Sequence, residues 1–248
     1  MKKMQTLQLL GVGLLVVVAV LFIVTRGGSL DWRNASRERV GLAPDPATTP
    51  AAVVQVYAAR TWGWKGYFGV HTWVAVKAEG APNYTVYEVI GWRLRWEESV
   101  LAIRNRAPDE RWFGSTPMLL ANRRGSEAGA LIGRIDKAAR GYPYAAQYTM
   151  WPGPNSNTFT AWIGRAVPEL GLDMPPTAIG KDYLGDRFFA RAPSGSGIQL
   201  SLFGLLGVTV SGVEGFELNV LGLSFGLDPF SPAIKLPLIG RLGARARK

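Results

Sequence analysis

The sequence predicts an α+β protein in which helices pack on an antiparallel sheet, with a transmembrane helix before it and a glycine-rich β-hairpin after it. Three observations predict this class: strand-like runs before residue 93, helical runs between residues 127 and 170, and alternating glycine-punctuated runs after residue 196. With 248 residues, of which 48% are hydrophobic, the chain can bury the core of one compact domain.

The first 25 residues predict a membrane anchor. Met4–Thr25 is uncharged, and its apolar core Leu7–Val24, in which only Gln8 is polar, is about long enough to cross a bilayer as a helix. The following letters, VTRGGSL, do not form a small-residue cleavage site, so an uncleaved signal anchor is favoured over a removed signal peptide. Basic residues flank the segment on both sides, so charge does not fix its orientation.

Residues 26–52 are polar and then proline-rich, which predicts a tether between the anchor and the folded part. We expect one α+β domain over residues 53–195, with residues 196–248 belonging to the same domain. Its first strand is expected from Val53. A hairpin follows, with strands at 71–77 and 84–92 around a turn at 80–83. Residues 96–104, WEESVLAIR, fit a strand edge and a helical turn equally well.

Two helices are expected after the sheet. Residues 127–143 place small and apolar side chains on one face before a Gly-Tyr-Pro stop. The stretch WPGPNSNTF at 151–159 then leads into an apolar run over 157–170, which predicts a helix that ends before Pro168.

The runs 197–212 and 215–228 predict a β-hairpin that turns near residues 213–215. A transmembrane pair is disfavoured because it would bury Glu214, Glu217 and Asn219. The basic ending favours a solvated tail over a foot that rests on anionic headgroups; its cations are Lys235, Arg241, Arg245, Arg247 and Lys248.

The composition excludes several kinds of chemistry. The chain has no cysteine, so it cannot build a disulfide, a catalytic thiolate or a cysteine-type zinc site. One histidine without cysteine cannot form the usual metal shells, and we expect no metal and no cofactor. The net charge of +10 comes from scattered cations, which favours anionic lipid or cell-surface polymer over nucleic acid as a partner.

His71 is the one histidine in the chain, so it is either the general base or any base is a carboxylate or lysine. Its place at the start of a strand suits a side chain that enters a cleft, but the hairpin by itself favours a hydrogen-bonded structural histidine. If the hairpin turns at 80–83, Glu88 lies across from about Val74 and could hold the imidazole tautomer, with Tyr87 as the alternative. An exposed strand carboxylate is an equal interpretation for Glu88.

Ser156 stands where the second helix begins, and two interpretations compete. As an N-cap, a Ser, Asn or Thr here would accept hydrogen bonds from the first turn and contribute about 1 kcal/mol. As a nucleophile, its hydroxyl would lie among amides and a positive dipole end that stabilise an oxyanion. The second interpretation requires His71 beside it, because a serine hydroxyl needs a base.

The segments HTWVAV, YTVYEV and NSNTF resemble the circularly permuted papain-like superfamily over about residues 66–165. That superfamily includes cell-wall amidases and peptidases related to the NlpC family, and lecithin:retinol acyltransferase-like enzymes. More closely, HTWVAVK, WPGPNSNTF, AIGKDY and PAIKLPLIG resemble an uncharacterised bacterial family of membrane-anchored proteins, a domain of unknown function. Ser156 stands where the papain-like enzymes carry cysteine.

The resemblance implies that Ser156 is the nucleophile, His71 its base and Glu88 the orienting group. Backbone amides of Ser156 and Asn157 would then stabilise the oxyanion, with Asn155, Asn157 and Thr158 positioning the substrate. It implies an acyl hydrolase or acyltransferase anchored in an inner membrane, with its main domain in the periplasm, acting on an amide or ester of peptidoglycan or lipid. The alternative is a non-catalytic envelope protein that keeps the fold to bind wall, lipid or a protein partner.

The aromatic residues that flank His71 have two interpretations. The core of the domain is the favoured interpretation for most of them, and the apolar wall of a cleft for a lipid or acyl chain is the alternative. These residues are Trp62, Trp64, Tyr67, Phe68 and Trp73.

Overall fold

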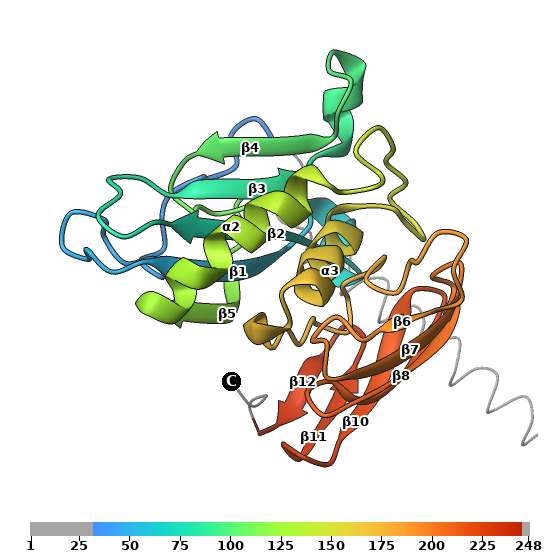
Figure 1. The fold of residues 1–248 in the computed structure, drawn as a ribbon. Helices are drawn as coiled ribbons and strands as arrows, with labels where there is room; N and C mark the ends of the chain where they lie inside the picture. The colour runs from blue at the N-terminus through green and yellow to red at the C-terminus, as the bar shows by residue number, and fades with distance from the viewer. Residues whose placement is uncertain (1–31, 245–248) are drawn as a thin grey trace, which may run out of the picture.

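A computed structural model describes residues 32–244, which form two antiparallel sheets and two α-helices (Figure 1). The α+β class is therefore confirmed. The N-terminal sheet has the strand order β4-β3-β2-β1-β5, and the C-terminal sheet has the order β12-β11-β10-β9-β8-β7-β6. No helix within residues 32–244 is long and apolar enough to cross a membrane. The expected anchor, Met4–Thr25, lies outside the described residues.

The N-terminal sheet follows the predicted hairpin closely. Its central pair, β1 and β2, is in register along the whole length of both strands, and β3 and β4 extend the sheet on the β2 side. The ambiguous run 96–104 ends in β4, after the short 3-10 helix η2 (Gly91–Arg95), so its second half is a strand. The strands are β1 (Val53–Arg60), β2 (Val70–Lys77), β3 (Thr85–Val89), β4 (Leu101–Asn105) and β5 (Met118–Arg124).

Both predicted helices are present and lie on one face of the N-terminal sheet (Figure 1). The helix α2 (Ser126–Arg140) packs against β1 and β5, and α3 (Ser156–Ala166) packs against β2 and β3. Their buried side chains, such as Ile135 and Phe159, join the valines of the sheet in the main core. The amphipathic spacing that predicted the helices therefore marks the faces they bury.

The opposite face of this sheet carries a second, smaller core. Tyr57 and Trp73 stack there with ring centroids 5.5 Å apart, and Trp112 of the loop after β4 packs against them. Asp109 of the same loop is fully buried and accepts hydrogen bonds from the backbone of Leu42, at 2.8 Å, and of Ala43.

The later part of the segment predicted as a tether contacts the domain. The backbone of Val40 donates to Asp109, and the Tyr84 hydroxyl donates to the Pro44 carbonyl at 3.0 Å. Gly80 donates to the carbonyl of Pro50. Residues 40–50 therefore lie along the sheet.

The C-terminal hairpin prediction requires correction, because each predicted run folds back on itself. The strands are β6 (Phe189–Arg191), β7 (Gly197–Leu202), β8 (Leu206–Ser211), β9 (Gly215–Val220), β10 (Leu223–Asp228), β11 (Ala233–Leu236) and β12 (Gly240–Gly243). The predicted turn before Gly215 does join β8 to β9. Tight turns at Gly204 (φ 74°) and Gly222 (φ 85°) divide the two runs, because glycine adopts this left-handed backbone without strain.

The solvated-tail interpretation of the basic ending is wrong for the cations that the structure describes. Lys235, on β11, is buried, and its Nζ lies 2.5 Å from Asp173 and 2.9 Å from Glu217. Arg241, on β12, pairs with Asp228 at 2.6 Å. These cations attach the last two strands to the protein. Arg245, Arg247 and Lys248 lie outside the described residues.

Candidate functional site

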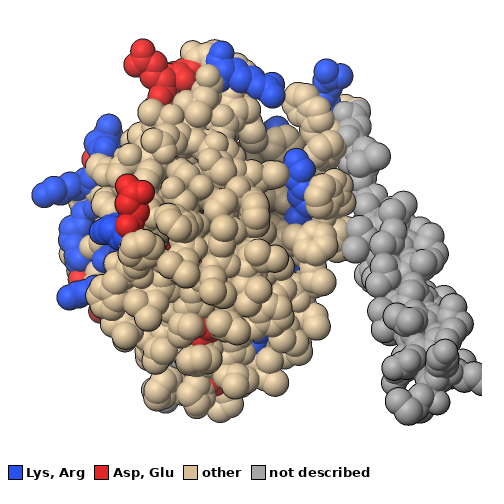
Figure 2. Space-filling model, turned by 90° about the vertical axis from the view of Figure 1, so that its right-hand side faces the viewer, with Lys and Arg blue, Asp and Glu red and all other residues tan. Residues whose placement is uncertain are grey.

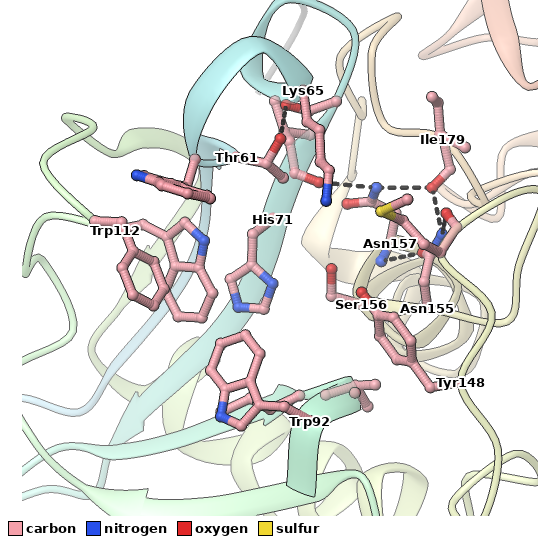
Figure 3. Close-up of a pocket in the computed structure, with 18 of the residues that line it drawn as sticks. Thr61, Lys65, His71, Trp92, Trp112, Tyr148, Asn155, Ser156, Asn157 and Ile179 are labelled. Atoms are coloured by element: carbon pink, nitrogen blue, oxygen red, sulfur yellow. Dashed lines mark hydrogen bonds between the residues drawn. The ribbon is translucent and has the colours of Figure 1, made fainter. Parts of the chain in front are cut away.

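A cavity of about 1130 Å³ lies between the start of β2, the η2 turn and the start of α3 (Figure 3). His71, Asn155, Ser156 and Asn157 all line it. Its walls are aromatic, because seven of the chain's nine tryptophans contribute to them. These are Trp32, Trp62, Trp64, Trp92, Trp96, Trp112 and Trp151.

His71 is the second residue of β2, is only 5% exposed, and contacts a carboxylate. Its Nε2 lies 3.3 Å from Glu88 Oε2. Glu88 pairs across the sheet with Trp73 and not with Val74 as expected, and this one-residue difference places Glu88 on the same face as His71. The alternative partner Tyr87 faces away, and its hydroxyl donates to Asp136 on α2.

Glu88 is fully buried and is held by two arginines in addition to His71. Arg104 Nη2 lies 2.6 Å from one carboxylate oxygen, and Arg106 Nη2 lies 3.4 Å from the other. Burial alone would raise the pKa of Glu88, but the His71 hydrogen bond and the charge of Arg106 outweigh it, so the pKa lies well below its usual range. Glu88 is therefore an ionised acceptor for His71.

Two tryptophan rings pack against the His71 imidazole. Trp112 stacks on it with ring centroids 3.7 Å apart, and the Trp73 ring lies 5.7 Å from it. Burial lowers the pKa of His71, and the hydrogen bond to Glu88 offsets only part of this effect. The imidazole is therefore neutral at pH 7. Because Glu88 contacts Nε2, the other ring nitrogen is the one that faces the Ser156 side of the cavity (Figure 3).

Ser156 is the first residue of α3, and it does not cap the helix. The N-cap is Asn155, whose side chain accepts from the backbone of Asn157 and Thr158, while Thr158 Oγ1 accepts from the Asn155 backbone. The capping interpretation of Ser156 is therefore wrong, because Asn155 is the residue that caps the helix. The Ser156 hydroxyl is left to line the cavity, and its backbone N–H has no acceptor among the described residues.

The other polar residues of this stretch have structural partners. The Asn157 N–H donates to Asn155 Oδ1 at 2.9 Å, so the expected pair of oxyanion amides is reduced to the amide of Ser156. The Asn157 side chain donates to the carbonyls of Val70 and Ile179. The Thr158 hydroxyl donates to Gly180, and Thr158 does not line the cavity. These contacts fix the start of α3 and its neighbouring loop.

Thr72 connects the strand of His71 to the helix of Ser156. Its Oγ1 lies 3.1 Å from the Ser156 carbonyl and 3.0 Å from Asn157 Oδ1. Because Thr72 follows His71 directly on β2, the helix start is fixed one residue away from the imidazole. This contact is why residues 85 positions apart in the sequence share one cavity.

Three groups of the site were not identified from the sequence. Arg104 on β4 and Arg106 directly after β4 both contact Glu88. Their spacing of two residues places both on one face of a strand, so this pattern could have indicated a shared partner. Trp112 lies in a loop, where no local pattern indicates contact with His71. Tyr148 points its hydroxyl toward the Ser156 side of the cavity (Figure 3). Its ring lies against Gly91, where a Cβ would come within 2.4 Å of it.

Four of the five aromatic residues that flank His71 in the sequence divide between the two interpretations, and Tyr67 belongs neither to the cavity lining nor to a core cluster. Trp62, Trp64 and Phe68 line the cavity, whereas Trp73 is fully buried in the smaller core. The cavity lining also carries three cations and, within the described chain, no Asp or Glu. The cations are Arg37, Lys65 and Arg95.

The comparisons with known proteins identify a family without a known activity. No curated protein and no solved structure matches the chain. The model of the family described as "Protein of unknown function (DUF3750)" matches residues 51–183, more than half of the chain. The matched region runs from the start of β1 to just before β6 and contains His71, Glu88 and Ser156. The protein therefore belongs to the DUF3750 family.

Proposed function

We propose that this protein is an acyl hydrolase or acyltransferase of the cell envelope that uses Ser156 and His71 on an ester or amide. One observation carries the proposal: a neutral imidazole held by an ionised carboxylate shares a cavity with a serine hydroxyl that its helix does not use for capping. A serine becomes a useful nucleophile when a neighbouring base can take its proton.

The reaction follows from these positions. His71 takes the proton of Ser156 Oγ as that oxygen attacks the carbonyl carbon of the substrate, and the carbonyl oxygen becomes an oxyanion. The Ser156 N–H at the start of α3 and the Tyr148 hydroxyl are the donors available to stabilise it. The intermediate collapses, the leaving alcohol or amine takes the proton from His71, and the acyl group stays on Ser156.

The acyl group then passes to an acceptor by the same steps in reverse. Water or an acceptor hydroxyl or amine gives its proton to His71 and attacks the acyl carbon, and Ser156 recovers its proton as it leaves. Glu88 stabilises the imidazolium in both halves, because it is ionised and contacts Nε2. Arg104 and Arg106 keep Glu88 in place and are positioning residues.

The walls of the cavity favour a lipid substrate over a peptidoglycan peptide. Tryptophan and other apolar side chains line most of it, and its volume is large enough to enclose part of an acyl chain. The three lining cations, without an opposing carboxylate, suit an anionic headgroup. The substrate class that fits best is an anionic acyl lipid.

The finer fold assignment, a circularly permuted papain-like domain, is part of the same proposal. The order His71, Glu88, Ser156 along the chain is the order of base, orienting group and nucleophile in that superfamily. The position of α3 on the sheet, with its first residue beside the strand of the histidine, agrees with it. Serine in place of cysteine is the departure, and a Ser–His pair supports the same reaction class.

A non-catalytic lipid-binding protein is the second candidate. Figure 3 draws no hydrogen bond between Ser156 and His71, although both side chains are shown. A pocket that only binds lipid would need the aromatic walls and the cations, but not a neutral imidazole and a serine hydroxyl in the same cavity. The two candidates therefore differ in the chemical reactivity of position 156.

A fluorophosphonate probe on the full-length protein tests that reactivity. We expect the probe to label the protein, and both Ser156→Ala and His71→Ala to abolish labelling. The matched control is Ser126→Ala, because Ser126 is the first residue of α2, as Ser156 is of α3, but is exposed and outside the cavity. Absent labelling, or labelling that survives both cavity substitutions, overturns the catalytic proposal and leaves the binding protein.

A second measurement tests the geometry of the pair without requiring turnover. The chain has no cysteine, so Ser156→Cys introduces the single thiol. A thiol beside His71 should be alkylated by iodoacetamide faster below pH 8 than the same thiol in a Ser156→Cys/His71→Ala double variant. Equal rates in the two variants would show that His71 does not act on position 156.

A further inference from the structure

The outer face of the C-terminal sheet is apolar except at Arg191 on the edge strand β6, which is the reverse of an antiparallel sheet exposed to water. Along β7 the exposed residues are Ile198, Leu200 and Leu202, while Gln199 and Ser201 between them are buried. The strand β9 repeats the pattern, with Phe216, Leu218 and Val220 exposed and Glu217 and Asn219 buried. Because successive side chains of a strand point to opposite faces, every polar side chain of β7 and β9 points to the inner face.

The outward side chains, all exposed except the half-buried Val208, form continuous rows across the sheet. One row crosses six strands in direct register and consists of Ile198, Val210, Phe216, Leu227, Ile234 and Leu242. A second row crosses five strands and consists of Phe189, Leu200, Val208, Leu218 and Phe225. We call the surface made by these two rows the apolar sheet face.

The inner face is not free to turn outward, because its polar groups are paired with the rest of the protein. Glu217 lies between two buried lysines, 2.6 Å from Lys181 and 2.9 Å from Lys235. Gln199 accepts from Arg165 of α3 at 2.5 Å. The orientation of the sheet is therefore fixed, and the apolar rows face away from the molecule.

The apolar sheet face is large enough to indicate an interaction surface. Four of the seven strands have six residues and the other three have three or four, so with strands about 4.8 Å apart and a rise of about 3.3 Å per residue the sheet covers roughly 550 Å². That is the upper end of the range for the largest apolar patch of an ordinary monomeric protein, about 300–600 Å². In Figure 2, the lower part of the molecule, where this sheet lies, shows almost no blue or red.

We propose that the apolar sheet face rests in the surface of a lipid bilayer. The chain outside the structure supports this occupant, because the apolar stretch Leu7–Val24 ends only eight positions before Trp32. Eight extended residues span at most about 28 Å, so a bilayer that holds the stretch lies within reach of the described domain. A surface of this composition gains most by entering the boundary between headgroups and acyl chains.

The apolar sheet face is also connected to the rim of the cavity. Trp151 at the rim donates from its indole N–H to the carbonyl of Leu221, in the turn between β9 and β10, at 2.9 Å. Leu221 is 61% exposed, and Trp64 and Trp96 on other parts of the rim are exposed to a similar extent. Exposed tryptophans with nearby cations such as Lys65 are typical of a membrane interface. The cavity thus adjoins the surface proposed to meet lipid.

The absence of cysteine makes a direct test possible. Single substitutions Phe216→Cys and Leu227→Cys place a thiol on the apolar sheet face, and Glu79→Cys places one on an exposed turn of the N-terminal sheet. Each full-length variant is labelled with an environment-sensitive fluorophore and reconstituted in phosphatidylcholine–phosphatidylglycerol vesicles. Lipids brominated near the headgroup end of the acyl chains then serve as the quencher.

We expect both labels on the sheet face to lose more than half of their fluorescence to brominated lipid and to resist aqueous iodide. The Glu79→Cys label should show the opposite behaviour. Sheet-face labels that iodide quenches and brominated lipid does not would overturn the proposal. So would labels that neither reagent reaches, because another part of the chain would then cover the face. Disulfide dimers through Phe216→Cys, in place of lipid quenching, would show a second copy there.

A charge substitution separates this contact from the proposed chemistry. Phe216→Asp combined with Leu227→Asp changes exposed positions, so circular dichroism and fluorophosphonate labelling in detergent should remain unchanged. Lipid quenching of a label at Ile234→Cys, in the same row, should fall at least severalfold. Unchanged quenching at Ile234→Cys would contradict the proposal. Membrane contact and Ser156 reactivity can therefore fail independently.

Discussion

The two sheets of this protein distribute polar and apolar side chains in opposite ways. Both faces of the N-terminal sheet are covered, and β1 and β2 are buried almost from end to end. The C-terminal sheet buries a polar face and exposes an apolar one. Strands of the same geometry therefore have different environments in the two sheets. The side chains on the outer face of each sheet indicate whether that face contacts protein, water or an apolar partner.

Buried polar groups also have different roles in the two regions. In the N-terminal sheet, the neutral imidazole of His71 lines the cavity, and the ionised Glu88 is its fully buried partner. In the C-terminal region, Glu217 pairs with Lys235 of the same sheet and with Lys181 of the segment before it, and these pairs attach the sheet. The family match covers the first region and stops before the second, so the candidate site belongs to the part described by the family model.

The largest effect is expected for Glu217→Ala. Its removal leaves two buried lysines with weaker partners, and breaking a buried ion pair costs about 3–5 kcal/mol of unfolding free energy. The neighbouring exposed residue is the control, and Leu218→Ala should cost about 0.5 kcal/mol or less. Denaturant unfolding of both variants in detergent measures the difference. A larger loss for Leu218→Ala would contradict the inverted pattern.

Two isoleucines provide a matched comparison between the regions. Ile163 on α3 is fully buried, so Ile163→Ala should lower the unfolding free energy by about 2–5 kcal/mol. Ile198 on β7 is 51% exposed, and Ile198→Ala should change it by about 0.5 kcal/mol or less. Both are measured by the same denaturant titration in detergent. Equal losses would show that the outer face of the C-terminal sheet is packed against protein.

The smallest effect concerns the pH dependence of Ser156 labelling. Labelling needs neutral His71, whose pKa lies below the 6.5 of a free imidazole. The labelling rate should therefore fall as the pH is lowered, with a midpoint below pH 6.5. Because Glu88 raises the pKa of His71, Glu88→Gln should move the midpoint to still lower pH and reduce the maximum rate. The exposed carboxylate variant Glu79→Gln should leave the profile unchanged. A midpoint that rises in Glu88→Gln would refute the assignment of Glu88.

The sequence predicted most of the N-terminal region because its signals are local. Periodicity located both helices and the hairpin, and polar residues before an apolar run located the start of α3. Which residue caps that helix could not be predicted, because Asn155, Ser156 and Thr158 are all suitable types. The hydrogen bonds of Asn155 settle it and leave Ser156 to the cavity.

The residues that complete the site depend on distant parts of the chain. The register of β3 against β2 differed by one residue from the expected one, and this decided that Glu88, rather than Tyr87, contacts His71. Trp112 stacks on the imidazole from a loop whose path depends on Asp109 and the segment before β1. Loop paths of this kind carry no periodic signal, so the sequence could not indicate them.

In the C-terminal region, the alternation of apolar and polar residues was enough to predict strands with two different faces, and the glycines marked places where a run could turn. Which of the two faces is buried could not be predicted in this way, because alternation of period two is the same whichever face points inward. Lys181 and Arg165, which precede these strands in the chain, pair with Glu217 and Gln199 and turn the polar face inward. The apolar rows were thereby left outside.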